Sequence, residues 1–402
     1  MAKYVEDEYE YEERPRKKSS SGGHGGSKKS SGSGSKSSGK KGSGKKSSGK
    51  KSKKEQAKKQ RRRIIIFVVE IMILLVAVFV LYSVMMTTKS GKMVLEEDDV
   101  IINDTVKKAE ETTMKGYRNI ALFGVDSTSG ALTKNTRSDT IMIASINQDT
   151  GECKLVSVYR DTYLNLSNDS YNKCNAAYAK GGPEMAISML NMNLDMNITD
   201  FVTVGFAGLT DTIDALGGVY IDVDDAEISH LNNYQLCIAE DLKRSYTPVA
   251  STGYQLLDGL QATGYCRIRY TAGDDFKRAE RQREVLSAVA DQAKKASLPQ
   301  LTETANKVFN ETYTSLDLSE IIEMLGEVGT YYISDTAGFP QESNRTTGTI
   351  GSKGSCVIPL SLEDNVKWLH QFLFNDYDYE PSAKVKECSE KIYSDTNGYL
   401  NK

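Results

Sequence analysis

One apolar stretch near the N-terminal end constrains this chain more than any other feature. Residues 64–86 read IIIFVVEIMILLVAVFVLYSVMM and carry a single charge, Glu70. About 20 apolar residues in a helix cross a bilayer, and the basic region before this stretch is too long for a signal peptide. We therefore expect a retained transmembrane helix over 64–86. Glu70 either contacts a partner helix or snorkels to the membrane interface.

The charge is distributed unevenly on the two sides of this stretch. Residues 1–63 hold 21 Lys+Arg against 7 Asp+Glu, and the remainder holds 30 against 47. The positive-inside rule then predicts a cytoplasmic N-terminus and an acidic body outside the cell membrane. Residues 19–54 are nearly all Ser, Gly and Lys, so the tail over 1–63 should be disordered. It rests on anionic lipid headgroups or is a solvated spacer, and the lack of aromatic residues among its lysines argues against a nucleic acid as partner.

The body after the apolar stretch has the pattern of a mixed α/β fold. Residues 87–117 are charged and read as an extracellular stalk that is partly helical. Asn119–Val125 is a short apolar run suited to a buried strand. Thr140–Ile146 and Cys153–Tyr159 flank the turn signal DTG and predict a β-hairpin. Strands that alternate with helices predict a central sheet flanked by helices, an αβα sandwich, and the hairpin makes that sheet mixed.

The downstream elements are predicted from periodicity and turn residues. Helices are expected at 183–194, 208–216, 254–263, 318–328 and 361–374, and strands at 200–206 and 219–223, whereas 224–252 and 335–353 read as irregular. Six cysteines are present without a CxxC pair. Zinc-ligand spacing is therefore absent, and the sequence does not decide which disulfides, if any, form.

The predicted hairpin gathers charged residues at one edge of the sheet. Pairing across the turn places Arg160 and Asp161 beside Arg137 and Asp139. If the strand that begins at Asn119 runs parallel to the return strand, Asp126 reaches the same edge. Three acids and two arginines then crowd one rim of the sheet, an arrangement that is costly unless a site uses it.

A second group of charges lies in the stretch GYCRIRYTAGDDFKRAERQ. Arg267 and Arg269 are two apart in a segment of strand character, which would put both guanidinium groups on one face. Asp275 stands where a helix would begin. One face of that helix carries a polar start and an apolar continuation, namely Arg278, Arg281, Gln282, Val285 and Val289. These charges are either solvated or form a cationic pocket for a phosphate or pyrophosphate.

Seven segments in a fixed order resemble the LytR-CpsA-Psr family of cell-wall enzymes. They are NIALFGVD, RSDTIMIASIN, LVSVYRDTYL, CNAAYAKGG, DALGGVYIDV, LLDGLQATGYCRIRY and GDDFKRAERQREVL, between Asn119 and Ala290. The resemblance assigns a catalytic domain to 118–298 and a C-terminal extension, packed on or beside it, to 299–402. The sequence departs from the family pattern at Tyr159, where the family usually has proline, and at Thr263-Gly264, where it often has Ala-Leu. These departures remove no charged group.

The resemblance implies a phosphotransferase anchored in the cell membrane. Such proteins move a glycopolymer, for example teichoic acid or capsule, from a polyprenyl-pyrophosphate carrier to peptidoglycan, with magnesium (or manganese) at the pyrophosphate and a hydrophobic pocket for the lipid tail. The implied metal ligands are Asp126 and Asp139, and the implied pyrophosphate ligands are Arg137, Arg160, Arg267, Arg269, Arg278, Arg281 and Gln282. A base for the acceptor hydroxyl is expected at Asp161 or Asp275.

Two other functions remain open from the sequence. The same residues with water as acceptor would hydrolyse the lipid pyrophosphate. A non-enzymatic envelope regulator is the other alternative, although residues 1–63 contain no helix-turn-helix pattern.

Overall fold

The computed structural model describes residues 91–95, 97–126, 132–133, 135–269 and 273–400. All of them belong to one compact unit. The predicted tail over 1–63 and the predicted transmembrane helix over 64–86 lie outside the described residues. Within these ranges, no helix combines the length and the apolar character that a membrane span requires.

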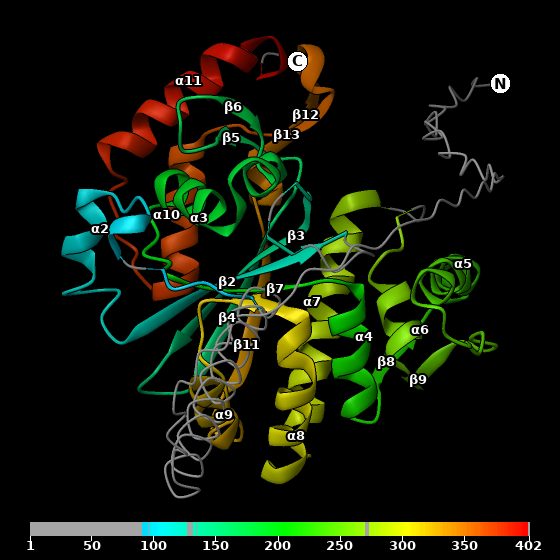
Figure 1. Ribbon diagram of the computed structural model, residues 1–402. Coiled ribbons are helices and arrows are strands. Elements are labelled where there is room, and N and C mark those ends of the chain that lie inside the picture. The colour runs from blue at the N-terminus through cyan, green and yellow to red at the C-terminus, as the bar shows by residue number, and fades with distance from the viewer. Residues whose placement is uncertain (1–90, 96, 127–131, 134, 270–272, 401–402) are drawn as a thin grey trace, which may run out of the picture. The chain divides into compact units, whose positions relative to one another are not determined.

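A seven-stranded mixed sheet organises the described part of the chain (Figure 1). The order across it is β1-β10-β7-β2-β3-β4-β11. The pairs β2–β3, β3–β4 and β10–β7 are antiparallel, and the pairs β2–β7, β4–β11 and β1–β10 are parallel. The strands are β1 (Gly91–Lys92), β2 (Tyr117–Val125), β3 (Ser138–Asn147), β4 (Glu152–Val158), β7 (Asp200–Val204), β10 (Thr312–Thr314) and β11 (Tyr332–Phe339).

Helices cover both faces of this sheet, which confirms the predicted mixed sheet with flanking helices (Figure 1). Alternate strand residues such as Phe123, Ile143 and Val156 pack with α3 (Asn175–Leu194) and α10 (Leu362–Phe374) in the main core cluster. Residues of the opposite phase, including Ala144 and Leu155, pack near Leu286 of α7 (Asp274–Ala293). The period of two along each strand thus separates residues that pack with α3 and α10 from residues that pack near α7.

The predicted hairpin is present, and its register fixes the edge that matters for function. Ile143 pairs with Val156 across the β3–β4 turn, and Gly124 pairs with Thr140 across β2–β3. Because β2 and β4 both run antiparallel to β3, their carboxyl ends lie at the edge where β3 begins. Asp126, Asp139 and Arg160 are therefore at one edge, as the sequence predicted.

The stalk predicted for 87–117 is wrong for the part that the structure describes. Strand β1 joins the sheet, and α2 (Asp104–Ala109) follows it. Val106, Ala109 and Met114 are buried in the main core cluster. These apolar side chains are separated by charged residues, so the composition of the segment did not reveal that one of its faces packs against the domain.

The C-terminal hundred residues complete the sheet as well as cover it. Strands β10 and β11 belong to the central sheet, so the predicted boundary between residues 298 and 299 falls inside one sheet-forming unit. The predicted loop over 335–353 instead holds most of β11 and the strand β12 (Arg345–Thr349), which pairs with β13 (Ser355–Pro359). These strands are rich in Ser, Thr and Gly, which gives little hydrophobic alternation to detect. The helix predicted at 361–374 is α10, and α11 (Ala383–Leu400) follows it.

The segment between 219 and 266 differs most from prediction. The supposedly irregular stretch 224–252 contains α5 (Asp225–Leu242), which begins with a capping box between Asp224 and Glu227. The predicted helix at 254–263 is instead β9 (Gly253–Leu257), paired with β8 (Val219–Val223), followed by α6 (Gly259–Tyr265). Helices α5 and α6 pack closely at Gly264, where a Cβ would come within 2.9 Å of the Leu231 carbonyl oxygen.

Of the remaining elements, those predicted at 183–194, 208–216 and 318–328 are present near these ranges, whereas the elements at 163–165, 171–173 and 298–308 were not predicted. Helix α3 is broken at Gly182, whose φ is 69°, and Pro183 starts its second part as the first-turn proline predicted there. The other elements are β5 (Tyr163–Asn165), β6 (Tyr171–Lys173), α4 (Phe206–Ala215), α8 (Leu298–Val308) and α9 (Leu318–Gly326). All six cysteines are free, and only Cys237 is exposed.

Candidate active site

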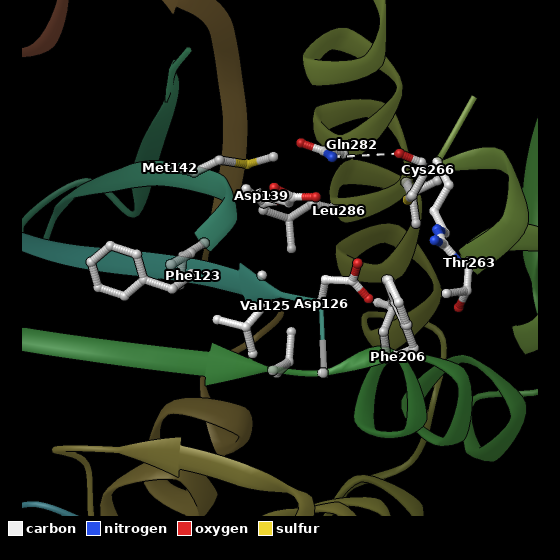
Figure 2. Close-up of a pocket in the computed structure, with 18 of the residues that line it drawn as sticks. Phe123, Val125, Asp126, Asp139, Met142, Phe206, Thr263, Cys266, Gln282 and Leu286 are labelled. Atoms are coloured by element: carbon white, nitrogen blue, oxygen red, sulfur yellow. Dashed lines mark hydrogen bonds between the residues drawn. The ribbon is translucent and has the colours of Figure 1, made fainter. Parts of the chain in front are cut away.

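A cavity of about 380 Å³ lies between the sheet and the helices α4, α6 and α7. Most of its wall is apolar and comes from strand residues such as Leu122 and Met142 and from Val285, Leu286 and Val289 of α7. Figure 2 shows Asp126, Asp139 and Gln282 around the same space as Met142 and Leu286. Along α7 the lining changes from Arg278 and Gln282 to these apolar residues, as the predicted helix face required. The cavity therefore has an apolar body and a charged end.

Asp275 is the centre of the charged end. Arg269 donates to both of its carboxylate oxygens, at 3.0 and 3.2 Å. Nε of Arg160 lies 3.4 Å from Oδ2, and Nη2 of Arg278 lies 3.4 Å from Oδ1. Arg160 also donates to Asp139 at 2.8 Å, and Arg278 donates to the Asp139 carbonyl oxygen at 3.4 Å. One carboxylate thus holds three guanidinium groups together, drawn from a strand end, a loop and a helix.

The electrostatics of this cluster follow from burial and from the excess of arginine. Burial alone would raise the pKa of Asp275, but Arg278, Arg160 and Arg269 bring it below its ordinary value. Burial lowers the pKa of Arg278, and the neighbouring Arg160 lowers it further, against Asp275 and Asp139. Burial also acts to lower the pKa of Arg160, yet Asp139, Asp275 and Asp161 raise it overall. Three arginines share the one Asp275 carboxylate, so the cluster has positive charge to spare.

Arg267 and Arg269 reach the cavity by a different route from the one predicted. The segment is not a strand, because α6 ends at Tyr265 and Cys266 is its C-cap. Arg267 lies over the rings of Phe206 and Tyr234, with its Cζ 4.4 and 5.3 Å from the two centroids. Both arginines nevertheless line the cavity. The turn after α6 thus places both arginines at the cavity, where strand alternation had been expected to place them.

The other predicted site residues divide into two groups. Asp126, Asp139 and Gln282 line the cavity, and Nε2 of Gln282 donates to the Cys266 carbonyl oxygen at 3.4 Å (Figure 2). Arg137, Arg160, Asp161, Asp275 and Arg281 do not line it, although Asp275 pairs with Arg269 and Arg278, which do, and Arg160 pairs with Asp139. Arg137 is exposed just before β3.

Asp161 and Arg281 have partners outside the cavity. Asp161 is near Arg160, at 4.0 Å, and pairs with Lys173 at 3.3 Å. Nε of Arg281, which is 2% exposed, donates to Glu227 of α5 at 2.7 Å, away from the cavity. Lys173 and Glu227 were not identified from the sequence. The spacing of Asp224 and Glu227, a D-x-x-E capping box, was the available signal for α5.

The sequence matches the LytR_cpsA_psr family over residues 79–339, about two thirds of the chain. The chain belongs to the LytR-CpsA-Psr family. It is 35% identical over 161 residues to the probable cell wall biosynthesis protein LcpB of Corynebacterium glutamicum, which covers 39% of this chain and 34% of that protein. It is 30% identical over 215 residues to the polyisoprenyl-teichoic acid–peptidoglycan teichoic acid transferase TagU of Oceanobacillus iheyensis, which covers 52% of this chain and 61% of that protein.

The solved structure of Bacillus subtilis TagV has the same fold. The two superpose with a TM-score of 0.52 at 25% identity, over 66% of this chain and 99% of that one. The chain spans less than two thirds of the length of both curated relatives named above.

In this LytR-CpsA-Psr protein, Asp126 and Asp139 have the donor chemistry for a hard cation. Asp126 is exposed, and it forms no hydrogen bond or ion pair with the rest of the described chain. No group of three or more His, Cys, Asp or Glu side chains in the described ranges is arranged to hold a metal ion. Magnesium is commonly held by one or two carboxylates together with substrate phosphates and water. The pair therefore fits an ion that a phosphorylated substrate helps to bind.

Proposed function

We propose that this protein is a membrane-anchored phosphotransferase. It transfers a glycopolymer from a polyprenyl-pyrophosphate carrier to a hydroxyl group of peptidoglycan. The observation that carries this proposal is the cavity, in which an apolar body ends at Arg269 and Arg278, which share Asp275 with the neighbouring Arg160. An amphiphile with an apolar tail and a highly anionic head fits such a space.

The charged end supplies what phosphoryl transfer requires of a protein, namely position and charge neutralisation. Arg160, Arg269 and Arg278 bind the non-bridging oxygens of the pyrophosphate, and Asp275 fixes the directions of the three guanidinium groups. Asp126 and Asp139 would hold magnesium, or manganese, which would offset negative charge on the pyrophosphate. Apolar residues of β2, β3, α4 and α7 bind the first part of the polyprenyl chain and exclude water from it.

The reaction exchanges one P–O bond for another. The oxygen of the acceptor hydroxyl bonds to the phosphorus that carries the glycopolymer. The bond from that phosphorus to the bridging oxygen breaks, and polyprenyl phosphate leaves with the electron pair. The hydroxyl proton passes to a carboxylate. The two candidate carboxylates are Asp275, which three arginines engage, and Asp161, which is outside the cavity lining and pairs with Lys173 and Arg160.

Membrane anchoring brings the cavity to its substrate. The apolar residues 64–86 and the basic residues before them are the basis for an anchor with the domain outside the cell. The carrier lipid is then in the same membrane as the protein. The transfer needs no ATP, because the pyrophosphate bond of the carrier is already activated.

The test uses the full-length protein in detergent micelles with a polyprenyl-pyrophosphate-linked sugar polymer and magnesium. Release of polyprenyl phosphate is measured for the wild type, Asp139→Ala and Arg269→Ala. Loss of one charge contact typically costs about 10²-fold or more in rate, so both variants should be nearly inactive. Arg118→Ala is the matched control, because Arg118 pairs with Asp200 at the opposite end of β2.

Added peptidoglycan fragments separate transfer from hydrolysis. A transferase diverts the polymer from free phosphorylated product to a peptidoglycan conjugate as the fragments are added. A hydrolase gives the same product at every fragment concentration. Tight lipid binding without turnover, with and without fragments, would contradict both activities and leave a carrier-lipid binding protein.

A further inference from the structure

Two aromatic residues are the sequence neighbours of Arg160 and Asp275, the ion pair that links the end of β4 to α7. Tyr159 directly precedes Arg160, and Phe276 directly follows Asp275. Their rings meet edge to face, with centroids 4.7 Å apart and an interplanar angle of 87°. The contact spans the same gap as the ion pair between Arg160 and Asp275, which is 3.4 Å long. The separation of the two charged groups therefore depends on how the rings pack.

Arg345 of β12 lies over both rings. Its Cζ is 4.2 Å from the centroid of Phe276 and 5.0 Å from that of Tyr159. Its Nη1 donates to the Pro340 carbonyl oxygen at 3.1 Å, which ties the guanidinium to the segment after β11. A cation over an aromatic ring is attracted by the ring's negative face, more strongly where water is excluded. Arg345 lies beyond residues 79–339, the range of the family match.

The Tyr159 ring cannot move away from this contact toward β11. Its hydroxyl sits over Gly338, where a Cβ would come within 1.9 Å of the oxygen. The backbone is held as well, because Tyr159 N donates to the Phe339 carbonyl oxygen at 3.0 Å and Thr162 Oγ1 donates to the Tyr159 carbonyl oxygen at 2.6 Å. The ring is 8% exposed. Tyr159 is thus held in place by its neighbours, and Phe276 packs against both it and the Arg345 guanidinium.

We propose that Arg345 is a positioning residue for the active site. It clamps Phe276 onto Tyr159, and this contact fixes the first turn of α7, with Asp275 and Arg278, relative to Arg160. The C-terminal β12–β13 segment thereby controls the geometry of the pyrophosphate cluster without touching the substrate. This inference rests on the proposed function, because the cluster is assigned there to a lipid pyrophosphate.

The size of the effect follows from how the cluster acts. Displacement of a substrate-positioning group by about 1 Å costs about 10²-fold in rate. Loss of a cation–ring contact shifts an equilibrium by about tenfold where the site is poorly solvated. Arg345→Met removes the charge and retains the length of the side chain. It should weaken pyrophosphate binding about tenfold and lower the transfer rate of the bound complex by a further factor of about ten. Arg345→Lys keeps a cation over the rings and should restore most of both.

The experiment compares full-length wild type, Arg345→Met and Arg345→Lys in detergent micelles. Geranylgeranyl pyrophosphate is the binding probe, and calorimetry gives the dissociation constant and the stoichiometry separately. A purely structural role would lower the fraction of competent protein, so the stoichiometry would fall while the dissociation constant stayed unchanged. The positioning role requires the reverse, with full stoichiometry, a weaker dissociation constant and rescue by lysine.

Binding and turnover answer different questions here. Wild-type protein that binds the probe and never releases polyprenyl phosphate from the polymer-linked substrate would remove the proposed function, while the binding comparison would still decide the role of Arg345. An Arg345→Met variant with the affinity and rate of the wild type would overturn the positioning role and leave the transferase intact. The same conclusion would follow if Arg345→Lys were as impaired as Arg345→Met.

Discussion

Two arginines of helix α7, Arg278 at the cavity and Arg281 one turn further along, differ in how their charge is balanced. At the cavity, Asp275 is shared by Arg160, Arg269 and Arg278, so cations outnumber the carboxylate that joins them. One turn along the helix, Arg281 forms a one-to-one pair with Glu227, and the two side chains are 2% and 5% exposed. The first arrangement has capacity for an anion and is partly open to solvent. The second joins α5 to α7 and has no charge to spare.

A third arginine of the same helix matches neither arrangement. Arg283 is 8% exposed, and its Nε and Nη1 have no hydrogen-bond partner within the described chain. Burial lowers the pKa of this guanidinium, against the nearby Tyr159 and Glu280. Sequence spacing alone does not distinguish these arginines. The partner that each arginine meets on another element decides whether it is available to a ligand, forms a structural ion pair or does neither.

The largest expected effect is on the structural pair. Glu227→Ala leaves the Arg281 guanidinium buried without its carboxylate, and removal of one partner of a buried pair costs about 3–5 kcal/mol of unfolding free energy. Chemical denaturation of the two proteins measures this loss. Glu280→Ala is the control, because Glu280 of the same helix forms an exposed pair with Lys277. Equal stability of the two variants would show that the buried pair contributes nothing.

The next effect separates function from stability. Arg278→Met should lower the rate of polyprenyl phosphate release about 10²-fold with little loss of thermal stability, because Arg160 and Arg269 repel the native charge. Arg281→Met should do the opposite, with reduced stability and a retained rate per folded molecule. Rate assays and melting curves on both variants test this. The comparison fails if both variants lose the same property.

A smaller gain in stability is expected at the uncompensated arginine. Arg283→Met replaces a buried guanidinium, whose Nε and Nη1 have no hydrogen-bond partner in the described chain, by an apolar side chain of similar length. Unsatisfied buried polar groups cost about 1–3 kcal/mol, so the variant should be about 1 kcal/mol more stable than the wild type. Denaturant titration detects a change of this size. A loss of stability would mean that the guanidinium contributes favourable contacts that outweigh its burial.

The smallest effect is a pH dependence at the cavity. Asp275 has a pKa below its ordinary value of 3.8, so the folded state binds fewer protons there than the unfolded state, and stability rises with pH through this window. The contribution is present above about pH 4 and is lost as the pH falls below 3.8. The unfolding free energies of wild type and Asp275→Asn should therefore converge at low pH. A constant difference from pH 6 to pH 2.5 would contradict the assignment.

The sequence was sufficient for features that depend on local pattern. Apolar runs and the DTG turn gave the β3–β4 hairpin, and from its register the meeting of Asp126, Asp139 and Arg160 at one edge followed. The face of α7 was also correct in Arg278, Gln282, Val285 and Val289, which line the cavity. The spacing of three to four residues fixed their direction.

Only the tertiary structure decided which charged residues have partners elsewhere and which segments complete the sheet. Sequence spacing puts Arg281 on the same helix face as Arg278, but Glu227 of α5 pairs with Arg281 and not with Arg278. The strands β10 and β11 have little hydrophobic pattern, and they are strands because β7 and β4 offer them backbone hydrogen bonds. Local periodicity determines where a side chain points, whereas its partner comes from a distant segment whose position depends on the packing of the whole domain.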